Sequence, residues 1–218
     1  MTRIIIIGGH GKVARKATPL LVEDGHEVTS VIRDPDQSKT ITKLGAEPAI
    51  ADVASMQKND LEELLRGHDV VVWAAGAGGG SPENTYALDR DAAIRSMDAA
   101  AAAGAERYVM VSYFGAGPDH GVPPDNDFFA YAEAKTQADA HLEESALKWT
   151  ILQPSGLTEG PTTRKIDVHA NDAGQVSRGN VAEVIRTVVG SDPSAVAGLK
   201  IPFNDGDSPI EEALRHVR

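Results

Sequence analysis

A run of four isoleucines at residues 4–7, followed at once by Gly8-Gly9-His10-Gly11, constrains the fold of this chain more than any other feature. β-branched side chains favour a strand, and the apolar spacing over residues 11–23 predicts a helix directly after the glycines. Glycine lets the backbone turn tightly and lets another group approach it closely. The sequence therefore predicts a strand–turn–helix unit whose turn lies against a ligand.

The glycines follow the spacing G-x-x-G-x-x-A, in which Gly8 permits the turn, Gly11 admits a pyrophosphate and Ala14 lets the helix lie close to the sheet. Exposed backbone N–H groups and the positive end of the helix would hold the phosphates. We therefore expect a dinucleotide to contact Gly8, Gly9, His10, Gly11, Lys12 and Val13. A tight turn without a ligand is the structural alternative, and a solvated Lys12 is as well supported as a Lys12 beside phosphate.

Strand-like and helix-like segments alternate along nearly the whole chain. Further strands are expected at 27–32, 49–50, 70–73, 108–111, 148–152 and 199–203, and helices at 35–44, 61–65, 83–103, 128–146, 181–189 and 209–216. Residues 166–169 and 175–176 are expected to pair as a hairpin. This alternation predicts an α/β fold, a Rossmann-type doubly wound parallel sheet with helices on both faces. The chain is expected to form one domain over residues 1–218, with a small substrate lobe from about 155–180 and 199–218.

Composition excludes several classes of function. Hydrophobic residues make up 41%, which is enough for a core, and the absence of cysteine excludes a disulfide framework or a thiolate site. The seven histidines have no metal-like spacing, so no metal site is expected. The net charge of −11 argues against nucleic acid or an anionic membrane as partner. With no long apolar stretch and no signal-peptide pattern, we expect a cytoplasmic protein whose partner is a small-molecule substrate; the oligomeric state is left open.

The end of the second expected strand bears on the choice of dinucleotide. It reads Val31-Ile32-Arg33-Asp34. An NAD site usually has an acid at this point for the ribose hydroxyl, whereas an NADP site has an arginine for the 2′-phosphate. Arg33 therefore favours NADP(H) over NAD(H). Asp34 or Asp36 facing the ribose is the alternative, and Arg33 could also be a surface cation paired with one of these acids.

A tyrosine and a lysine four residues apart suggest acid–base chemistry. Tyr131 and Lys135 share one face of the expected helix. A nearby cation favours the phenolate, so Lys135 is expected to lower the pKa of Tyr131. Ser112, at the end of the fifth strand, is placed to hydrogen-bond the same substrate oxygen. The alternative is that Tyr131 packs its ring while Lys135 is solvated.

Taken together, these stretches resemble the short-chain dehydrogenase/reductase superfamily, in particular its compact atypical branch that is described as NAD-dependent epimerase/dehydratase-like. The resemblance runs over "IIGGHGKVA", "VIRDP", "ADV", "VVWAAGAG", "YVMVSYFGAG", "YAEAKTQAD", "WTILQPSGLT" and "SRGNVAEVI". The sequence departs from the family at Ala14, which replaces the last glycine of the turn, and at Tyr113, which replaces a serine. The asparagine that supports the lysine is not evident, and Asp89 stands in the helix where it would be expected.

The resemblance implies further cofactor contacts. It places Asp52 and Val53 at the adenine, the backbone of Ala74-Ala75-Gly76 along the cofactor, and Lys135 at the nicotinamide ribose. A glycine-rich loop is expected to continue from these residues to Gly80. Together with the residues argued above, the full set expected to contact the cofactor beyond the turn is Arg33, Asp52, Val53, Ala74, Ala75, Gly76, Ser112, Tyr131, Lys135, Pro154, Ser155, Gly156 and Leu157. Ser112, Tyr131 and Lys135 would form the catalytic set.

The expected function is therefore that of an NAD(P)H-dependent oxidoreductase that transfers hydride to or from a small carbonyl or alcohol. A non-catalytic NADP(H) sensor that acts on a partner through loops such as 115–127 is the alternative. A sugar epimerase or dehydratase is less favoured, because only 64 residues follow Pro154 and leave room for a small substrate lobe.

Overall fold

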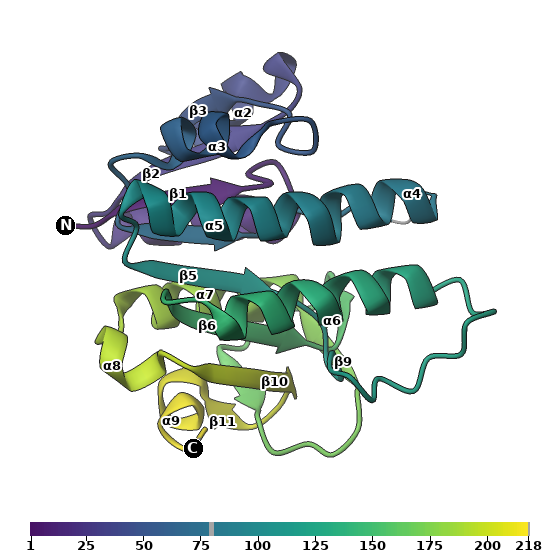
Figure 1. Ribbon diagram of the computed structural model, residues 1–218. Helices are drawn as coiled ribbons and strands as arrows, with labels where there is room; N and C mark the ends of the chain where they lie inside the picture. The colour runs from purple at the N-terminus through teal and green to yellow at the C-terminus, as the bar shows by residue number, and fades with distance from the viewer. Residues whose placement is uncertain (79–80, 218) are drawn as a thin grey trace.

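The structure is a computed structural model that describes residues 1–78 and 81–217. Within these residues a nine-stranded sheet has the order β11-β8-β10-β6-β5-β4-β1-β2-β3 (Figure 1). Its strands are parallel except where β8 meets β10 and β11. The strands are β1 Arg3–Ile7, β2 Glu27–Ile32, β3 Glu47–Ile50, β4 Val70–Trp73, β5 Arg107–Val111, β6 Lys148–Pro154, β8 Lys165–Asp167, β10 Leu199–Asp205 and β11 Ser208–Pro209. The order confirms the expected Rossmann-type fold, with its switch point between β1 and β4.

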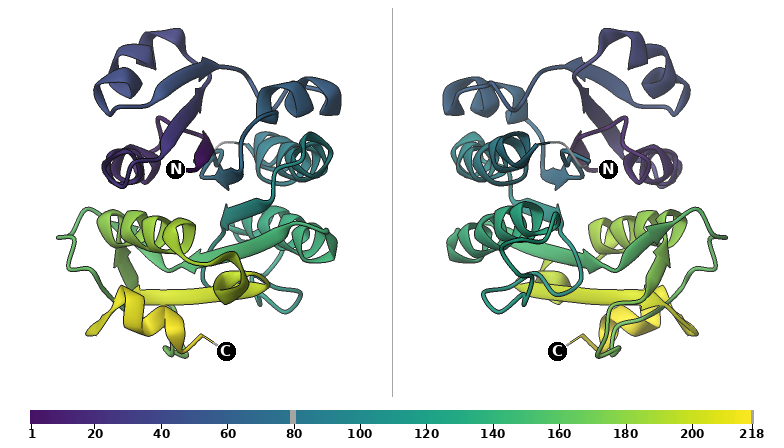
Figure 2. Two further views of the ribbon diagram at one scale, coloured as in Figure 1. Left: turned by 90° about the vertical axis from the view of Figure 1, so that its left-hand side faces the viewer. Right: turned by 90° about the vertical axis from the view of Figure 1, so that its right-hand side faces the viewer.

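Helices cover both faces of this sheet (Figure 2). Helices α1 and α7 pack together on one face, and α3, α5 and α6 lie on the other. The helical segments are α1 Ala14–Glu23, η1 Pro35–Gln37, α2 Ser38–Lys43, α3 Lys58–Leu65, α4 Pro82–Thr85, η2 Tyr86–Ala92, α5 Ala93–Ala103, α6 Phe129–Glu144, α7 Arg178–Gly190, α8 Pro193–Val196 and α9 Ile210–Arg215. Among the described helices, none combines the length and apolar character that a bilayer crossing requires.

The isoleucine run of β1 serves two hydrophobic cores. Ile4 and Ile6 belong to the cluster that includes α1 and α7, whereas Ile5 and Ile7 belong to the cluster under α3, α5 and α6. All four side chains are fully buried. Successive side chains of a strand point to opposite faces, so a central parallel strand covered on both faces reads as a continuous apolar run. The same rule accounts for residues 70–73.

Two expectations about local structure were incomplete or wrong. The hairpin between 166–169 and 175–176 does not form: β8 pairs with β10 and β11, and β9 (Gln175–Ser177) pairs in parallel with β7 (Gly156–Thr158). β10, in a segment expected to contribute to the small substrate lobe, extends the central sheet beside β6. The expected helix at 83–103 is present, but its segment η2 is π-helical. Residues 79 and 80 of the expected glycine-rich loop lie outside the described residues.

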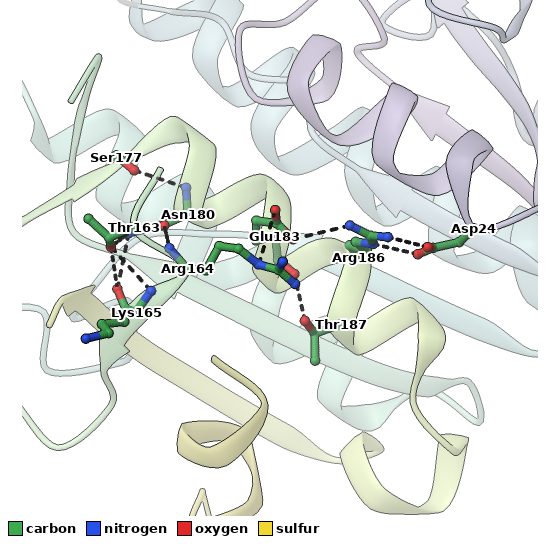
Figure 3. A network of polar contacts seen from close by, with 9 residues as sticks. All are labelled: Asp24, Thr163, Arg164, Lys165, Ser177, Asn180, Glu183, Arg186 and Thr187. Carbon is green, nitrogen blue, oxygen red and sulfur yellow. Dashed lines mark hydrogen bonds and ion pairs between the residues drawn. The ribbon is translucent and has the colours of Figure 1, made fainter. Parts of the chain in front are cut away.

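Helix α7 is held at both of its ends. At its start the Asn180 amide donates to Thr163 Oγ1 at 2.8 Å and accepts from the backbone N–H of Arg164 at 2.8 Å, as Figure 3 shows. At its other end the buried guanidinium of Arg107, from β5, donates to the carbonyls of Val188 and Val189 at 2.6 and 2.8 Å. The last carbonyls of a helix lack intrahelical partners and carry partial negative charge, so Arg107 both satisfies and neutralises them.

Candidate functional site

The glycine turn is shaped by contacts that exclude side chains. Gly8 has φ +87°, and a Cβ built there would lie 2.6 Å from the backbone N and Cα of Ala75. A Cβ at Gly9 would lie 2.5 Å from the Cβ of Ser30. Gly11 is less crowded, since its Cβ would lie 3.0 Å from the carbonyl oxygen of Gly8. The turn between β1 and α1 therefore packs directly on the end of β4.

The hydrogen bonds of the turn decide which N–H groups remain for a ligand. The N–H of Gly9 donates to Val31 O at 2.9 Å, and that of Gly11 donates to Gly8 O at 2.8 Å. Within the described part of the chain, the N–H groups of His10, Lys12 and Val13 have no acceptor. They precede the positive end of α1, an arrangement that suits phosphate. These three N–H groups are therefore candidates to bind a pyrophosphate, whereas those of Gly9 and Gly11 are already engaged within the fold.

A cavity of about 450 Å³ lies on one side of the turn, at the carboxyl ends of β1 and β2. We call it the Arg33 cavity. Its lining includes the turn residues Gly8, His10 and Gly11, the adenine-side candidates Arg33, Asp52 and Val53, and also Ile7, Val31, Ile32, Asp34, Gln37, Ala51, Ala54, Ala77 and Leu88. It has apolar walls for a flat ring and polar groups at its rim.

Arg33 and Asp34 do not pair in this cavity. The Asp34 carboxylate accepts from the backbone N–H of Asp36 at 3.0 Å and so caps η1. Among the described residues, no carboxylate lies within 4.0 Å of the Arg33 guanidinium, which is exposed on the cavity. The alternative of a surface cation paired with Asp34 or Asp36 is therefore wrong for this structure.

A second cavity, of about 510 Å³, lies on the other side of the turn, at the end of β5. We call it the Tyr131 cavity. Its lining includes Lys12, Val13, Ser112, Tyr131 and Leu157, together with Gly78, Pro82, Thr85, Val111, Asp127, Phe128, Ala130 and Arg178. Gly11, Ala74, Ala75 and Gly76 line both cavities. Two cavities that meet at a glycine turn match the two halves of a dinucleotide joined by a pyrophosphate.

Five of the residues named from the sequence line neither cavity within the described part of the chain. They are Gly9, Lys135, Pro154, Ser155 and Gly156. Gly9 shapes the turn against Ser30, and Ser155 is buried and donates to Asn204 Oδ1. Pro154 and Gly156 belong to β6 and β7. The stretch 154–157 therefore reaches the cavity through Leu157.

Lys135 lies behind the cavity in a buried charge cluster, which we define as Asp89, Lys135 and Asp139. Its side chain is fully buried, and its ammonium donates to the sulfur of Met110 at 3.1 Å. Burial lowers the pKa of Lys135, although the charges of Asp139 and Asp89 oppose this shift. One oxygen of Asp89 accepts from the Ala77 N–H at 3.0 Å, and its other oxygen has no partner in the described part of the chain. Burial raises the pKa of Asp89.

Asp139 connects this cluster to the cavity. Its carboxylate accepts from Ser112 Oγ at 2.5 Å, and Ser112 lines the Tyr131 cavity. Burial raises the pKa of Asp139 to about 6, even though Lys135 and the Ser112 hydrogen bond act in the opposite direction. A hydroxyl group has one hydrogen to donate. While Asp139 is ionised, Ser112 donates that hydrogen inward; once Asp139 is protonated, the hydrogen of Ser112 is free for a ligand.

The electrostatic surroundings of Tyr131 differ from those expected. Burial raises the pKa of Tyr131 well above its ordinary value, and the negative charges of Asp89 and Asp139 add to the rise. Lys135 is absent from the causes of this shift, so the expected lowering of the tyrosine pKa by lysine is not found in this conformation. A phenol with a raised pKa is protonated at neutral pH, which suits a proton donor and disfavours a base.

Sequence reasoning missed Asp139, Arg178 and Phe128. Asp139 had a signal, because it follows Lys135 by four residues, as Lys135 follows Tyr131, and all three share one helix face. Arg178 and Phe128 begin or precede a helix, and only the tertiary fold brings them to the same cavity. No group of histidine and carboxylate side chains in residues 1–78 and 81–217 is arranged to hold a metal ion.

Known proteins support the assignment that this geometry suggests. A family model described as NAD(P)H-binding matches residues 8–192. The UPF0659 protein C216.03 of Schizosaccharomyces pombe is 33% identical, over 98% of this chain and 94% of its own length. A putative NAD-dependent epimerase/dehydratase from Bacillus halodurans superposes with a TM-score of 0.89, at 28% identity over 98% of this chain and 99% of its own.

A second solved structure, the oxidoreductase ylbE of Lactococcus lactis, superposes with a TM-score of 0.87 at 25% identity, over 99% of this chain and 98% of its own. The matched region of the family model contains the glycine turn, the buried charge cluster and the described lining of both cavities apart from Ile7. The chain therefore belongs to the NAD(P)H-binding family of Rossmann-fold oxidoreductases, in its atypical short-chain dehydrogenase/reductase-like branch.

Proposed function

We propose that this protein is an NADPH-dependent reductase of small carbonyl compounds. The observation that carries the proposal is the position of two hydroxyl groups, those of Ser112 and Tyr131, on a cavity that continues across the glycine turn into the Arg33 cavity. A dinucleotide with its pyrophosphate at the N–H groups of His10, Lys12 and Val13 would reach both cavities. Bound NADPH supplies a hydride, and the protein supplies orientation and a proton.

The preference for NADPH over NADH rests on Arg33. Its guanidinium is exposed on the cavity and is free of carboxylate partners among the described residues, while Asp34 is engaged as the cap of η1. A planar guanidinium can stack on adenine and donate to a 2′-phosphate at the same time. Asp34 uses one carboxylate oxygen to cap η1, so only its other oxygen remains fully available for the unmodified ribose of NAD.

Tyr131 is proposed as the proton donor to the carbonyl oxygen, and Ser112 as the group that holds this oxygen. Because burial and two carboxylates raise the pKa of Tyr131, the phenol keeps its proton at neutral pH. The site is therefore suited to carbonyl reduction more than to alcohol oxidation, which needs the phenolate as base. Asp139 acts through Ser112 as a positioning residue, because its protonation releases the serine hydrogen toward the cavity.

Lys135 is proposed as a positioning residue as well. Its charge lowers the pKa of both Asp89 and Asp139 and so opposes the effect of burial on them. The ammonium stabilises two carboxylates in the low-dielectric interior, where uncompensated charge is costly. Its influence on Tyr131 would act through these carboxylates.

The proposal is tested by measuring NADPH consumption with a panel of aldehydes and ketones. Tyr131→Phe removes the proton donor and retains the ring, so we expect kcat/KM to fall by about 100-fold or more while NADPH still binds. Phe114→Leu, a conservative change outside the described lining of both cavities, is the matched control. Equal turnover by wild type and Tyr131→Phe would remove Tyr131 from the mechanism.

A non-catalytic NADP(H) sensor is the second candidate. The observation that favours it is the Lys135 ammonium, which contacts Met110 instead of the cavity. A sensor would bind NADPH tightly, consume none of it with any member of the panel, and retain a partner protein during purification. The cytoplasmic location expected from the sequence stays a prediction, which fractionation of the source cells would check.

A further inference from the structure

The Tyr131 cavity has an unusually exposed apolar wall. Of the large hydrophobic side chains that stay exposed in the described chain, two line this cavity: Phe128 at 43% and Leu157 at 38%. Phe128 is fixed by its neighbours, with its ring centroid 5.2 Å from that of Tyr131 and 5.1 Å from that of Tyr113, edge to face in the second case. A fixed aromatic side chain left open on a cavity favours an apolar, ring-sized ligand.

Two cations converge at the rim of this apolar cavity. Arg178 lines the cavity, and its side chain is only 19% exposed. Its Nη1 donates to the carbonyl oxygen of Leu157 at 3.1 Å and lies 3.1 Å from Glu159 Oε1. The ammonium of Lys12 lies 3.9 Å from the same oxygen. One carboxylate of the chain thus occupies the position between two cations, at the edge of the apolar wall.

Glu159 is free to leave this position. It belongs to residues 159–164, which connect β7 to β8 without regular structure and which we call the strap. The far end of the strap is pinned to α7: a Cβ at Gly179 would lie 1.8 Å from Thr162 Oγ1, and Asn180 holds Thr163 and Arg164 (Figure 3). The Glu159 side chain is 57% exposed, so its ion pair contributes little stability.

The lining also contains one acid, Asp127, beside Phe128. Asp127 is exposed and has no ion partner among the described residues. A solvated carboxylate interacts weakly with a ligand charge, whereas the largely buried Arg178 is oriented by its bond to Leu157 O and retains donors for a second partner. The cavity is therefore suited to a ligand that carries a negatively charged group.

We infer that the substrate of this site has a ring-sized apolar body and a carboxylate, and that Arg178 binds this carboxylate in the place now held by Glu159. The inference rests on the proposed reductase function and specifies its substrate class. The apolar body lies against Phe128 and Leu157, and the carbonyl faces Tyr131 and Ser112. Glu159 acts as an internal competitor that neutralises Arg178 and Lys12 until a substrate arrives.

The first test compares benzaldehyde with 4-carboxybenzaldehyde as substrates of the NADPH-loaded protein. Wild type is expected to show a kcat/KM about tenfold or more higher for the carboxylated aldehyde, as a charge-assisted hydrogen bond implies. Arg178→Met, which retains an apolar stem, should abolish this ratio, and Arg178→Lys should restore it in part. Arg66→Met is the control, because Arg66, which follows α3, forms a similar pair with Glu62 at 3.1 Å.

The second test measures binding without turnover. Benzoate, and benzyl alcohol as its uncharged counterpart, are titrated calorimetrically into protein loaded with NADP⁺. Benzoate should bind wild type, bind Glu159→Gln several-fold more tightly, and fail to bind Arg178→Met. Glu159 is exposed, so its variant provides a test that does not depend on the folding of an Arg178 variant. Thermal unfolding of each variant checks its fold.

The outcomes of the two tests distinguish a failure of the carboxylate inference from a failure of the proposed reductase function. If benzoate binds through Arg178 while neither aldehyde is reduced, the inference stands and the reductase proposal fails. If both aldehydes are reduced at equal kcat/KM and Arg178→Met leaves their ratio unchanged, the inference fails and the reductase proposal stands. If Arg178→Met weakens NADPH binding but leaves the ratio unchanged, Arg178 is a cofactor residue and the inference is overturned.

Discussion

Replacing Gly8 by alanine tests how closely the turn must approach β4. Gly8 and Gly25 have similar backbone angles, with φ values of +87° and +81°, so alanine at either position incurs a left-handed cost of about 1–2 kcal/mol. A Cβ at Gly25 meets no atom within 4 Å, whereas a Cβ at Gly8 lies 2.6 Å from two backbone atoms of Ala75. Backbone atoms cannot rotate away, so overpacking adds about 1–3 kcal/mol at Gly8 alone.

The assay is thermal unfolding of wild type, Gly8→Ala and Gly25→Ala, followed by calorimetric titration with NADPH. One kcal/mol shifts the midpoint of a domain of this size by about 2–4 °C, so Gly8→Ala should unfold about 2–12 °C below Gly25→Ala. Ala75 lines both cavities, and its displacement should weaken NADPH binding about tenfold or more. Equal midpoints and equal NADPH affinities for the two variants would refute this account of the turn.

Three further predictions follow from the cavities and the buried charges. Arg33→Ala should weaken NADPH binding about tenfold more than NADH binding, because a charge-assisted hydrogen bond to the 2′-phosphate is lost; competitive titration with both cofactors measures this difference. Because the pKa of Asp139 is raised from 3.8 to about 6, the folded protein keeps this proton longer than the unfolded chain, and the free energy of unfolding should fall by up to about 3 kcal/mol as pH rises from 4 to 6. In Asp139→Asn, denaturant titrations should show that this fall in the free energy of unfolding is lost. Wild-type kcat/KM should decrease as pH rises through 6, because ionised Asp139 takes the hydrogen of Ser112. In Asp139→Asn this decrease should be absent, since the amide donates to Ser112 at every pH. Arg107→Met should lower the melting temperature by about 6 °C or more, because two buried carbonyls at the end of α7 lose charge-assisted bonds; an unchanged midpoint in a calorimetric scan would contradict the capping role.

Features with a local cause were predictable from the sequence. The glycine turn is one such feature. The need for glycine arises where a strand enters a helix, and its signal is a set of residues adjacent in the sequence. The alternation of strands and helices is another, because each parallel strand is buried on both faces and each helix shows an apolar stripe. The approach of Tyr131 and Ser112 to one cavity follows from the rule that ligands meet the carboxyl ends of the strands.

The remaining features depend on tertiary contacts. The four-residue spacing places Tyr131 and Lys135 on one helix face, but it does not set the direction of a long lysine side chain, which here turns to Met110. The partner of β8 is decided by β10, which enters the sheet more than thirty residues later, so the hairpin expected from proximity was wrong. The π-helical segment η2, which contributes Asp89 to the buried charge cluster, changes the apolar pattern too little to be recognised.

The double anchoring of α7 has a consequence for how this scaffold can diversify. Asn180 fastens its first turn and Arg107 its last, so the helix cannot slide or tilt to admit a longer molecule. Adaptation to new chemistry must then arise in residues 159–161, the part of the connection that carries Glu159 and precedes the residues held by α7, because only this part can change without loosening the anchor. Grafting this connection from one relative into another should transfer ligand preference while the nucleotide half of the molecule stays as it is.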